Sequence, residues 1–155
     1  MYDACKEVFM DTIDTAILNC LKENGRATAS EISKRVNLSI PAVAERIRKL
    51  EQSRTIQKYT VKLDRKKIGQ SLLAFICVNI DKTKHITAFR QQITAYDCVL
   101  ECHHLAGTYD YLLKVSVRDT AELETFLSHS LKQISGVSSS STFITLATLK
   151  EELHC

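Results

Sequence analysis

The segment Leu72–Ile80 constrains the fold more than any other part of the sequence, because it is apolar on both of its alternating faces. This pattern is typical of a central β-strand that is covered on each side. The unbroken apolar run within it, Leu72–Val78, is far shorter than the roughly 20 residues that a transmembrane helix needs. We therefore expect a core built around a sheet, and no membrane partner.

The rest of the second half alternates helical and strand patterns. Apolar residues recur at helical spacing over His85–Ala95 and in a segment that begins at Asp119 and stops at Gly136. Runs bounded by turn residues predict three more strands, over Val99–Ala106, Tyr111–Val117 and Thr142–Leu149. The order βαββαβ is that of a ferredoxin-like unit, whose helices cover one sheet face. The other face would be open, so we expect a second copy of the chain to stack against it.

The first half has the pattern of three helices followed by a strand. A helix is predicted over Thr12–Glu23, a second from a capping box at Thr28 to near Asn37, and a third after the N-cap Ser39. Residues 55–63 then alternate with the period of a strand. The whole chain is therefore expected to have an α+β fold.

The third helix of this half is amphipathic in a way that suits DNA. Its apolar residues Ile40, Val43, Ile47 and Leu50 form the expected buried face. The opposite face is small near its start and basic toward its end, as a helix that enters a major groove requires. Ordinary solvated charges are the alternative for any single Arg or Lys, but the caps, the turn and the helix pair together favour DNA. The predicted DNA-binding residues are Thr28, Ser39, Pro41, Ala42, Glu45, Arg46, Arg48 and Lys49.

The two halves of the chain carry net charges of opposite sign. Residues 1–67 contain 14 Lys and Arg against 9 Asp and Glu, a net charge of +5, whereas residues 68–155 contain 7 against 9, a net charge of −2. A basic first half favours nucleic acid as the partner of that half alone. The first ten residues contain no apolar signal segment, so a cytoplasmic location is the default expectation.

Residues that could carry other chemistry are few. The four glycines are isolated, so no phosphate-binding loop or dinucleotide-binding turn can be assembled, and neither a cofactor nor an enzyme is predicted. Asp110, His103 and His104 are the one polar cluster that an enzyme could use, without an evident nucleophile and base. The six cysteines include no C-x-x-C pair, which favours reduced, buried thiols. A metal or redox sensor built on Cys98, Cys102 and His104, which share one strand face by their even spacing, is the weaker alternative.

Two groups of residues carry a resemblance to a known family. They are Arg26–Ser33, Leu38–Ser39 and Glu45–Glu51 in the first half, and Glu101–His103, Gly107–Lys114, Gly136–Val137 and Thr142 in the second. Together they resemble the Lrp/AsnC family, the leucine-responsive or feast/famine transcription regulators, over about residues 12–151. The resemblance implies a winged helix-turn-helix DNA-binding domain over residues 1–64, a linker over 65–71, and a ferredoxin-like ligand-binding and oligomerisation domain over 72–155.

The resemblance also implies partners. They are double-stranded DNA, a small-molecule effector that is usually an amino acid, and further copies of the chain, as a homodimer that assembles further, commonly to an octamer. The implied effector residues are Gly107, Thr108, Tyr109, Asp110 and Thr142. Turn N–H groups could bind the carboxylate of a zwitterion and Asp110 its ammonium group. The alternatives are that Gly107 and Asp110 serve only as hairpin residues, and that the protein is architectural and binds DNA without a ligand response.

Two departures from the family pattern lie beside the third helix. Ile40 stands between the N-cap Ser39 and Pro41, where the family usually has Pro directly after the serine. Arg54 stands where a Gly is customary after the helix. If residue 54 keeps a left-handed backbone, the arginine side chain would cost about 1–2 kcal/mol.

Overall fold

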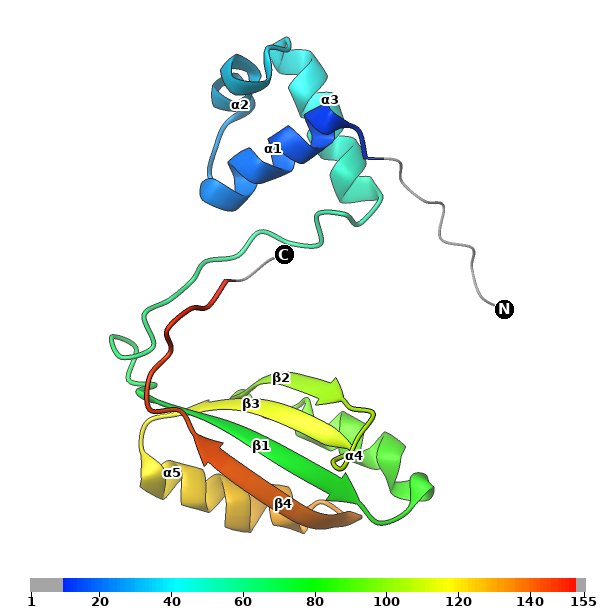
Figure 1. Ribbon diagram of the computed structural model, residues 1–155, viewed down its shortest axis with the longest axis vertical. Coiled ribbons are helices and arrows are strands. Elements are labelled where there is room, and N and C mark those ends of the chain that lie inside the picture. The colour runs from blue at the N-terminus through cyan, green and yellow to red at the C-terminus, as the bar shows by residue number, and fades with distance from the viewer. Residues whose placement is uncertain (1–9, 153–155) are drawn as a thin grey trace. The chain divides into compact units, whose positions relative to one another are not determined.

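The computed structural model describes residues 10–152, which divide into two compact units (Figure 1). The first unit ends at Lys62 and contains α1 (Thr12–Glu23), α2 (Ala29–Val36) and α3 (Ile40–Gln52). The second unit is Leu63–Glu152. No helix within the described residues is long and apolar enough to span a membrane. The predictions that rest on residues 1–9, on Cys5 and on Cys155 lie outside the described part of the chain.

Side-chain caps fix the starts of the three helices, and the sequence predicts those of α2 and α3. Thr28 and Glu31 form a complete capping box at α2, in which Glu31 N donates to the Thr28 hydroxyl and Thr28 N donates to the Glu31 carboxylate. The Ser39 hydroxyl accepts from Ala42 N at the start of α3. A small core joins the helices, made of Ile17, Cys20, Ile32, Val43 and Leu50. The expectation for Ile40 is wrong, because this first residue of α3 is 49% exposed.

The end of α3 keeps a left-handed residue although no glycine is present. Arg54 has a φ of +58°, and its N–H donates to Glu51 O, while Ile56 N donates to Leu50 O. The helix therefore closes as it would with Gly, and Arg54 carries the backbone cost of about 1–2 kcal/mol. The substitution is accommodated by strain at one residue rather than by a rearranged helix end.

The strand predicted over residues 55–63 is not formed. Within residues 10–152 no backbone segment pairs with residues 57–63, which continue as an irregular connecting segment. Their alternation is that of a strand, but a strand exists only when a neighbour supplies backbone hydrogen bonds. Tyr59, Val61 and Leu63, which share one side of this alternation, are 52%, 73% and 57% exposed.

The second unit is an antiparallel sheet in the order β2-β3-β1-β4, and the predicted βαββαβ order is confirmed. β1 (Leu72–Ile80) lies in the centre, paired with β3 (Tyr111–Val117) on one edge and β4 (Val137–Ile144) on the other. β2 (Val99–His104) pairs with β3. The core lies between the sheet and two helices, α4 (Ile86–Ile93) and α5 (Thr120–Thr125), the second of which continues through π and 3₁₀ turns to Gln133.

The position of the last strand corrects the sequence prediction. The sequence predicts a strand over Thr142–Leu149, but β4 begins at Val137 and ends at Ile144. The register with β1 decides this, because Val137 lies opposite Ile80 and Ile144 lies opposite Ala74. After a final bond from Thr145 N to Leu73 O the chain leaves the sheet. The predicted β2 also ends two residues early, at His104.

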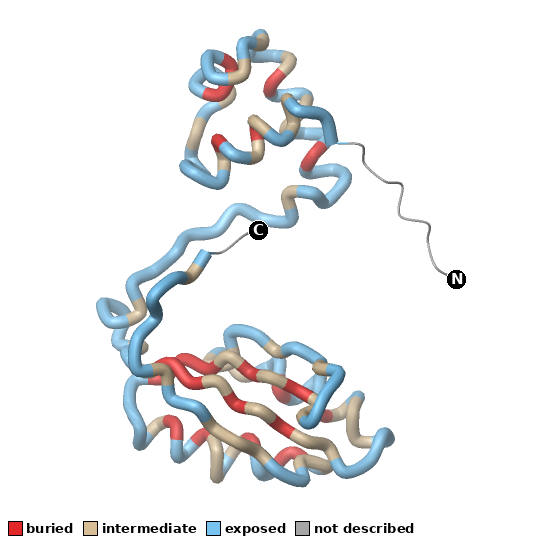
Figure 2. The backbone as a smooth tube through the Cα atoms, in the orientation of Figure 1, coloured by how far each residue is buried: buried red, intermediate tan, exposed pale blue. Residues whose placement is uncertain are grey.

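One face of this sheet is left open by the helices. Figure 2 shows buried residues alternating with half-buried ones along β1 and β3. The half-buried side chains of Phe75 and Cys77 lie on the face away from the helices, opposite Phe143 and Ser141 of β4. Phe143 is 57% exposed. The open face predicted from the sequence is therefore present and partly apolar.

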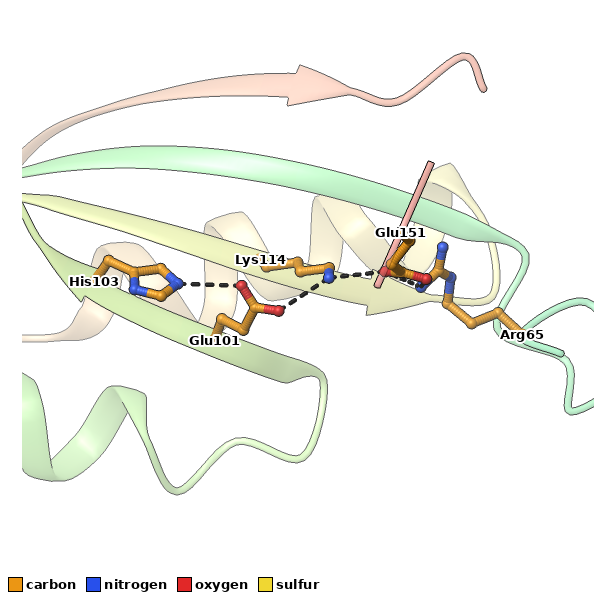
Figure 3. Close-up of polar contacts among 5 residues, drawn as sticks. All are labelled: Arg65, Glu101, His103, Lys114 and Glu151. Atoms are coloured by element: carbon orange, nitrogen blue, oxygen red, sulfur yellow. Dashed lines mark hydrogen bonds and ion pairs between the residues drawn. The ribbon is translucent and has the colours of Figure 1, made fainter. Parts of the chain in front are cut away.

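A chain of charged side chains runs along β2 and β3 on the open face to the segments before β1 and after β4 (Figure 3). Lys114 Nζ lies 2.9 Å from Glu101 Oε1 and 2.8 Å from Glu151 Oε1. Arg65 also binds Glu151, at 3.0 Å, and His103 lies 3.1 Å from Glu101. Hydrogen bonds from Lys114 and Arg65 lower the pKa of Glu151 from its ordinary value of 4.5 to about 2. The cluster fastens the segment after β4 and the segment before β1 to the sheet.

The acid dependence of stability tests this cluster. Because the pKa of Glu151 is lower in the folded state, its contribution is complete above about pH 4.5 and is lost as the pH falls toward about 2. We expect Glu151→Gln to reduce the free energy of unfolding by about 1 kcal/mol at pH 7, since water still reaches the pair, and by almost nothing near pH 2. Urea unfolding across this pH range measures the difference. Glu152→Gln, at an exposed pair with Lys150, is the matched control, and a wild-type curve parallel to that of Glu151→Gln would contradict the assignment.

Candidate DNA interface and effector site

The outward face of α3 is built as its sequence predicts. Pro41, Glu45, Arg48 and Lys49 are exposed, and Ala42 is half-buried, while Val43 and Leu50 hold the helix against the core. The side chains of Thr28 and Ser39 are occupied in the caps of α2 and α3. Their role in the structure is to fix where the two helices begin.

The two arginines of α3 have different surroundings. Arg46 Nη1 lies 2.7 Å from Asp11 Oδ2 and 2.7 Å from Asp14 Oδ1, so it ties α3 to the start of α1. Arg48 makes a bidentate pair with Glu45 of the same helix, at 2.8 and 2.7 Å, and both side chains are about half exposed. An exposed pair of this kind contributes little to stability, so Arg48 can leave it for a base or a phosphate at small cost. These contacts favour a structural role for Arg46 and a DNA contact for Arg48.

A matched pair of substitutions separates these two roles. We expect Arg48→Ala to weaken binding to a duplex selected from a random pool by about 1–3 kcal/mol, with stability changed by less than about 0.5 kcal/mol. Arg46→Ala should instead lower the unfolding temperature, because it leaves Asp11 and Asp14 without their cation. Fluorescence anisotropy and thermal unfolding measure the two effects. Unchanged affinity of Arg48→Ala would remove this residue from the DNA contacts.

The turn between β2 and β3 holds the predicted effector residues. The Asp110 carboxylate accepts from Ile80 N at 2.7 Å, and Asp110 N donates to Val78 O and to Asn79 Oδ1. Gly107 does not have a left-handed backbone, and a Cβ there would meet nothing within 4 Å. A side chain at residue 107 would therefore meet neither backbone strain nor a steric clash. These bonds tie Asp110 to the end of β1, which is a structural contact independent of any ligand.

Two of the remaining predicted effector residues are separated by the sheet. Tyr109 Oη lies 3.1 Å from Ser141 Oγ, and Ser141 is paired with Cys77 of the open face. Thr142 is paired with Ile76, whose side chain is fully buried on the helix side. Because side chains alternate along a strand, Thr142 is not brought to Tyr109 within a single chain.

A pocket of about 450 Å³ lies beside Asp110, and no local sequence pattern predicts it. Its other walls come from the end of β1, the start of α4 and β2, and include Asp81, Lys82, Thr83 and His104. His104 stacks on Tyr111 with ring centroids 5.1 Å apart. His85 lies 2.6 Å from Asp81 and lowers the pKa of that carboxyl. The pocket therefore presents carboxylates and an ammonium group together, which suits a small zwitterion.

The residues of the metal or redox alternative do not form a site. Among residues 10–152 no group of three or more His, Cys, Asp or Glu is placed to hold a metal ion. Cys98 and Cys102 pack against the core, and burial raises the pKa of both thiols. A raised pKa keeps a thiol protonated and unreactive. The structure thus favours two structural thiols and a histidine that stacks on Tyr111.

The chain joins a helical unit with a capped helix pair to a βαββαβ unit with a polar pocket. This is the architecture of a ligand-binding transcription regulator. Comparison with known families agrees: residues 10–51 match the AsnC-type helix-turn-helix domain and residues 73–154 match the Lrp/AsnC ligand binding domain. The chain belongs to the Lrp/AsnC family of transcription regulators.

Individual relatives and structures support the same assignment over nearly the whole chain. The HTH-type transcriptional regulator FL11 of Pyrococcus horikoshii is 35% identical, over 92% of this chain and 93% of its own. The leucine-responsive regulatory protein of Escherichia coli K12 is 33% identical, over 92% and 88%. The transcriptional regulator NMB0573 of Neisseria meningitidis, solved in complex with L-Met, superposes with a TM-score of 0.90 at 30% identity, covering 93% of this chain and 94% of that one. These relatives are regulators rather than enzymes.

Proposed function

We propose that this protein is a transcription regulator that binds double-stranded DNA through α3 and changes its assembly or DNA binding when a small amino acid binds beside the β2–β3 turn. The observation that carries the proposal is the presence, in one chain, of a helix pair with complete caps and a βαββαβ unit in which the turn residue Asp110 lines a polar pocket. The domain limits we propose are 1–64 for DNA binding, 65–71 for the linker and 72–155 for effector binding and oligomerisation. The protein acts in the cytoplasm.

The effector site is proposed at Gly107, Thr108, Tyr109 and Asp110, with the neighbouring pocket as its second wall. Asp110 and Asp81 line the pocket and supply negative charge for an ammonium group, and Lys82 supplies a donor for a carboxylate. The N–H groups of Gly107, Thr108 and Tyr109, which do not line the pocket, are the further donors of the proposal. Thr142 stays a candidate only as a contribution from a second copy. Two relatives support an amino acid as the ligand, because one carries L-Met in its structure and the other is named for its response to leucine.

The assembly that we propose begins with a homodimer in which two open sheet faces stack. Phe75 and Phe143 form an apolar pair at this face, and Leu146 and Leu149, in the segment that follows β4, are 100% and 97% exposed. Large apolar side chains exposed together favour a protein partner, and a second copy supplies the same surface by symmetry. Dimers would then assemble further, up to an octamer.

Two neighbouring substitutions in β1 test the dimer. Ile76 is fully buried on the helix side and Phe75 lies on the open face. We expect Ile76→Asp to unfold the second unit, because it buries an unpaired carboxylate, and Phe75→Asp to give folded monomers. Circular dichroism and multi-angle light scattering distinguish the two results. A wild-type protein that is a folded monomer at micromolar concentration would refute the stacked dimer.

Asp110→Asn tests the effector site. The amide oxygen of Asn can still accept from Ile80 N, so we expect the variant to fold, assemble and bind DNA as the wild type does, but to lose its thermal shift with amino acids. In the wild type a ligand at 100 times its Kd should stabilise the protein by about 2.7 kcal/mol. The probes are L-methionine and L-leucine first, then the other common amino acids.

Gly107→Ala is the companion variant, because its Cβ meets no atom and its stability should not change. If it also loses the ligand shift, the ligand approaches the turn closely. Should Asp110→Asn lose stability while its ligand shift is intact, Asp110 is a structural turn residue and the effector binds elsewhere.

A further inference from the structure

The net positive charge of residues 1–67 does not come from the segment that contains the three helices. Residues 1–53 contain eight Lys and Arg against eight Asp and Glu, a net charge of zero. Residues 54–67 contain six Lys and Arg against one acid, Asp64, a net charge of +5. The entire excess that makes this half basic therefore lies in the segment that follows α3.

The ion pairs of the structure also distinguish the helices from the segment that follows α3. On the helices, Arg35 is paired with Glu23, Arg46 with Asp11 and Asp14, and Arg48 with Glu45. In contrast, no carboxylate in the described part of the chain is paired with Arg54 or Lys58, and both side chains are exposed. The unneutralised cations of the helical unit thus include two that lie just beyond the end of α3.

Arg54 and Lys58 are held close to α3 rather than on a free linker. Ile56 packs against the core of the helical unit, and Ile56 N donates to Leu50 O. Tyr59 Oη donates to Glu51 Oε1 at 2.9 Å. Burial and the neighbouring Glu51 raise the pKa of Tyr59 to about 12, so the phenol keeps this donor at neutral pH. Both cations therefore move with the helix that reads DNA.

The segment that follows α3 has a basic side and an apolar side. The basic side suits a phosphate backbone. In an extended chain Lys58 and Lys62 fall on one side, and Tyr59, Val61 and Leu63 fall on the other. Arg54 and Lys58 are at most about 13 Å apart, and one DNA strand presents a phosphate for every 3.4 Å or so of helix axis. Two cations at this separation can meet phosphates of the same strand.

We infer that Arg54 and Lys58 form a second DNA contact, which binds the phosphate backbone and supplies sequence-independent affinity, while α3 reads the bases. The inference rests on the proposed DNA-binding function and adds a division of labour to it. Contacts to phosphates fix register and raise affinity for any sequence, whereas contacts to base edges discriminate between sequences. The basic segment would therefore set the salt dependence of binding, and α3 its specificity.

The experiment compares two double variants that remove equal charge. Arg54→Gln with Lys58→Gln removes the proposed contact, and Gln retains the same non-glycine backbone at position 54. Lys84→Gln with Lys132→Gln removes two exposed charges from the second unit and is the control. Each full-length protein is titrated with a 40-base-pair mixed-sequence duplex and with a duplex selected by the wild type, at several salt concentrations. Thermal unfolding and light scattering verify fold and assembly.

We expect the slope of log K against log salt to become shallower by about 0.9 for each phosphate that the variant no longer neutralises. For the two residues of each bound chain, the total change in slope is then about 2. Affinity at 150 mM salt should fall roughly fivefold for each such phosphate, equally for both duplexes, so that their ratio is unchanged. The control should keep the wild-type slope. The charge-conserving variant Arg54→Lys with Lys58→Arg should restore it.

Three results would overturn the inference and leave the proposed function standing. An unchanged slope in the Arg54 and Lys58 variant would show that neither residue meets a phosphate. An equal fall in affinity in the control would show that only net charge matters. A fall confined to the selected duplex would assign these residues to base reading. Failure of the wild type to bind either duplex would overturn the proposed function as well, which separates the two failures.

Discussion

The two-sided pairing of β1 is the interaction on which the second unit depends. β1 receives a strand on each edge, β3 and β4, and its register places Ala74, Ile76 and Val78 beneath the helices. Because side chains alternate along a strand, the same register puts Phe75 and Cys77 on the open face. The core and the open face are therefore set together, and a shift of one residue would exchange them. This explains why a segment that is apolar on both sides lies in the centre of the sheet.

Charge compensation organises the helical unit in a comparable way. The three arginines of its helices are paired with carboxylates of the same unit, and residues 1–53 have a net charge of zero, so the folded helices attract DNA little by charge alone. Reading a base requires a side chain that can leave its present partner cheaply. The exposed pair of Arg48 with Glu45 satisfies this requirement, and Arg46 between two carboxylates does not. The cations that attract DNA over a long range are then those outside the helices.

The parts of the fold that could be predicted from the sequence are those with local signals. Helix caps, the central strand and the β2–β3 turn depend on residues a few positions apart, and all are present. The prediction for β4 is displaced because its serines have little strand propensity and its position is imposed by β1. Residues 55–63 alternate as a strand does, but no neighbouring strand within the described residues supplies their backbone hydrogen bonds. The sequence points to Asp110 but not to Asp81 and Lys82, because 28 or more residues separate them along the chain and only the fold brings them together.

The proposed effector turn is itself part of the sheet, and this gives a ligand a physical means of changing the protein. Asp110 is bound to Ile80 at an irregularity in the β1–β4 pairing, and the neighbouring Asn79 donates to Ser139 of β4. Tyr109 reaches the same strand through Ser141. The bond to Ile80 N uses Oδ2, so an ammonium group at the proposed site would share this carboxylate with the bond that fixes the end of β1. A charge-assisted hydrogen bond contributes about 1.5–3 kcal/mol, which is the range of coupling free energies typical of allosteric proteins. At the proposed site, one such bond would therefore be large enough to affect the pairing of β1 with β4, the strand at the edge of the open face.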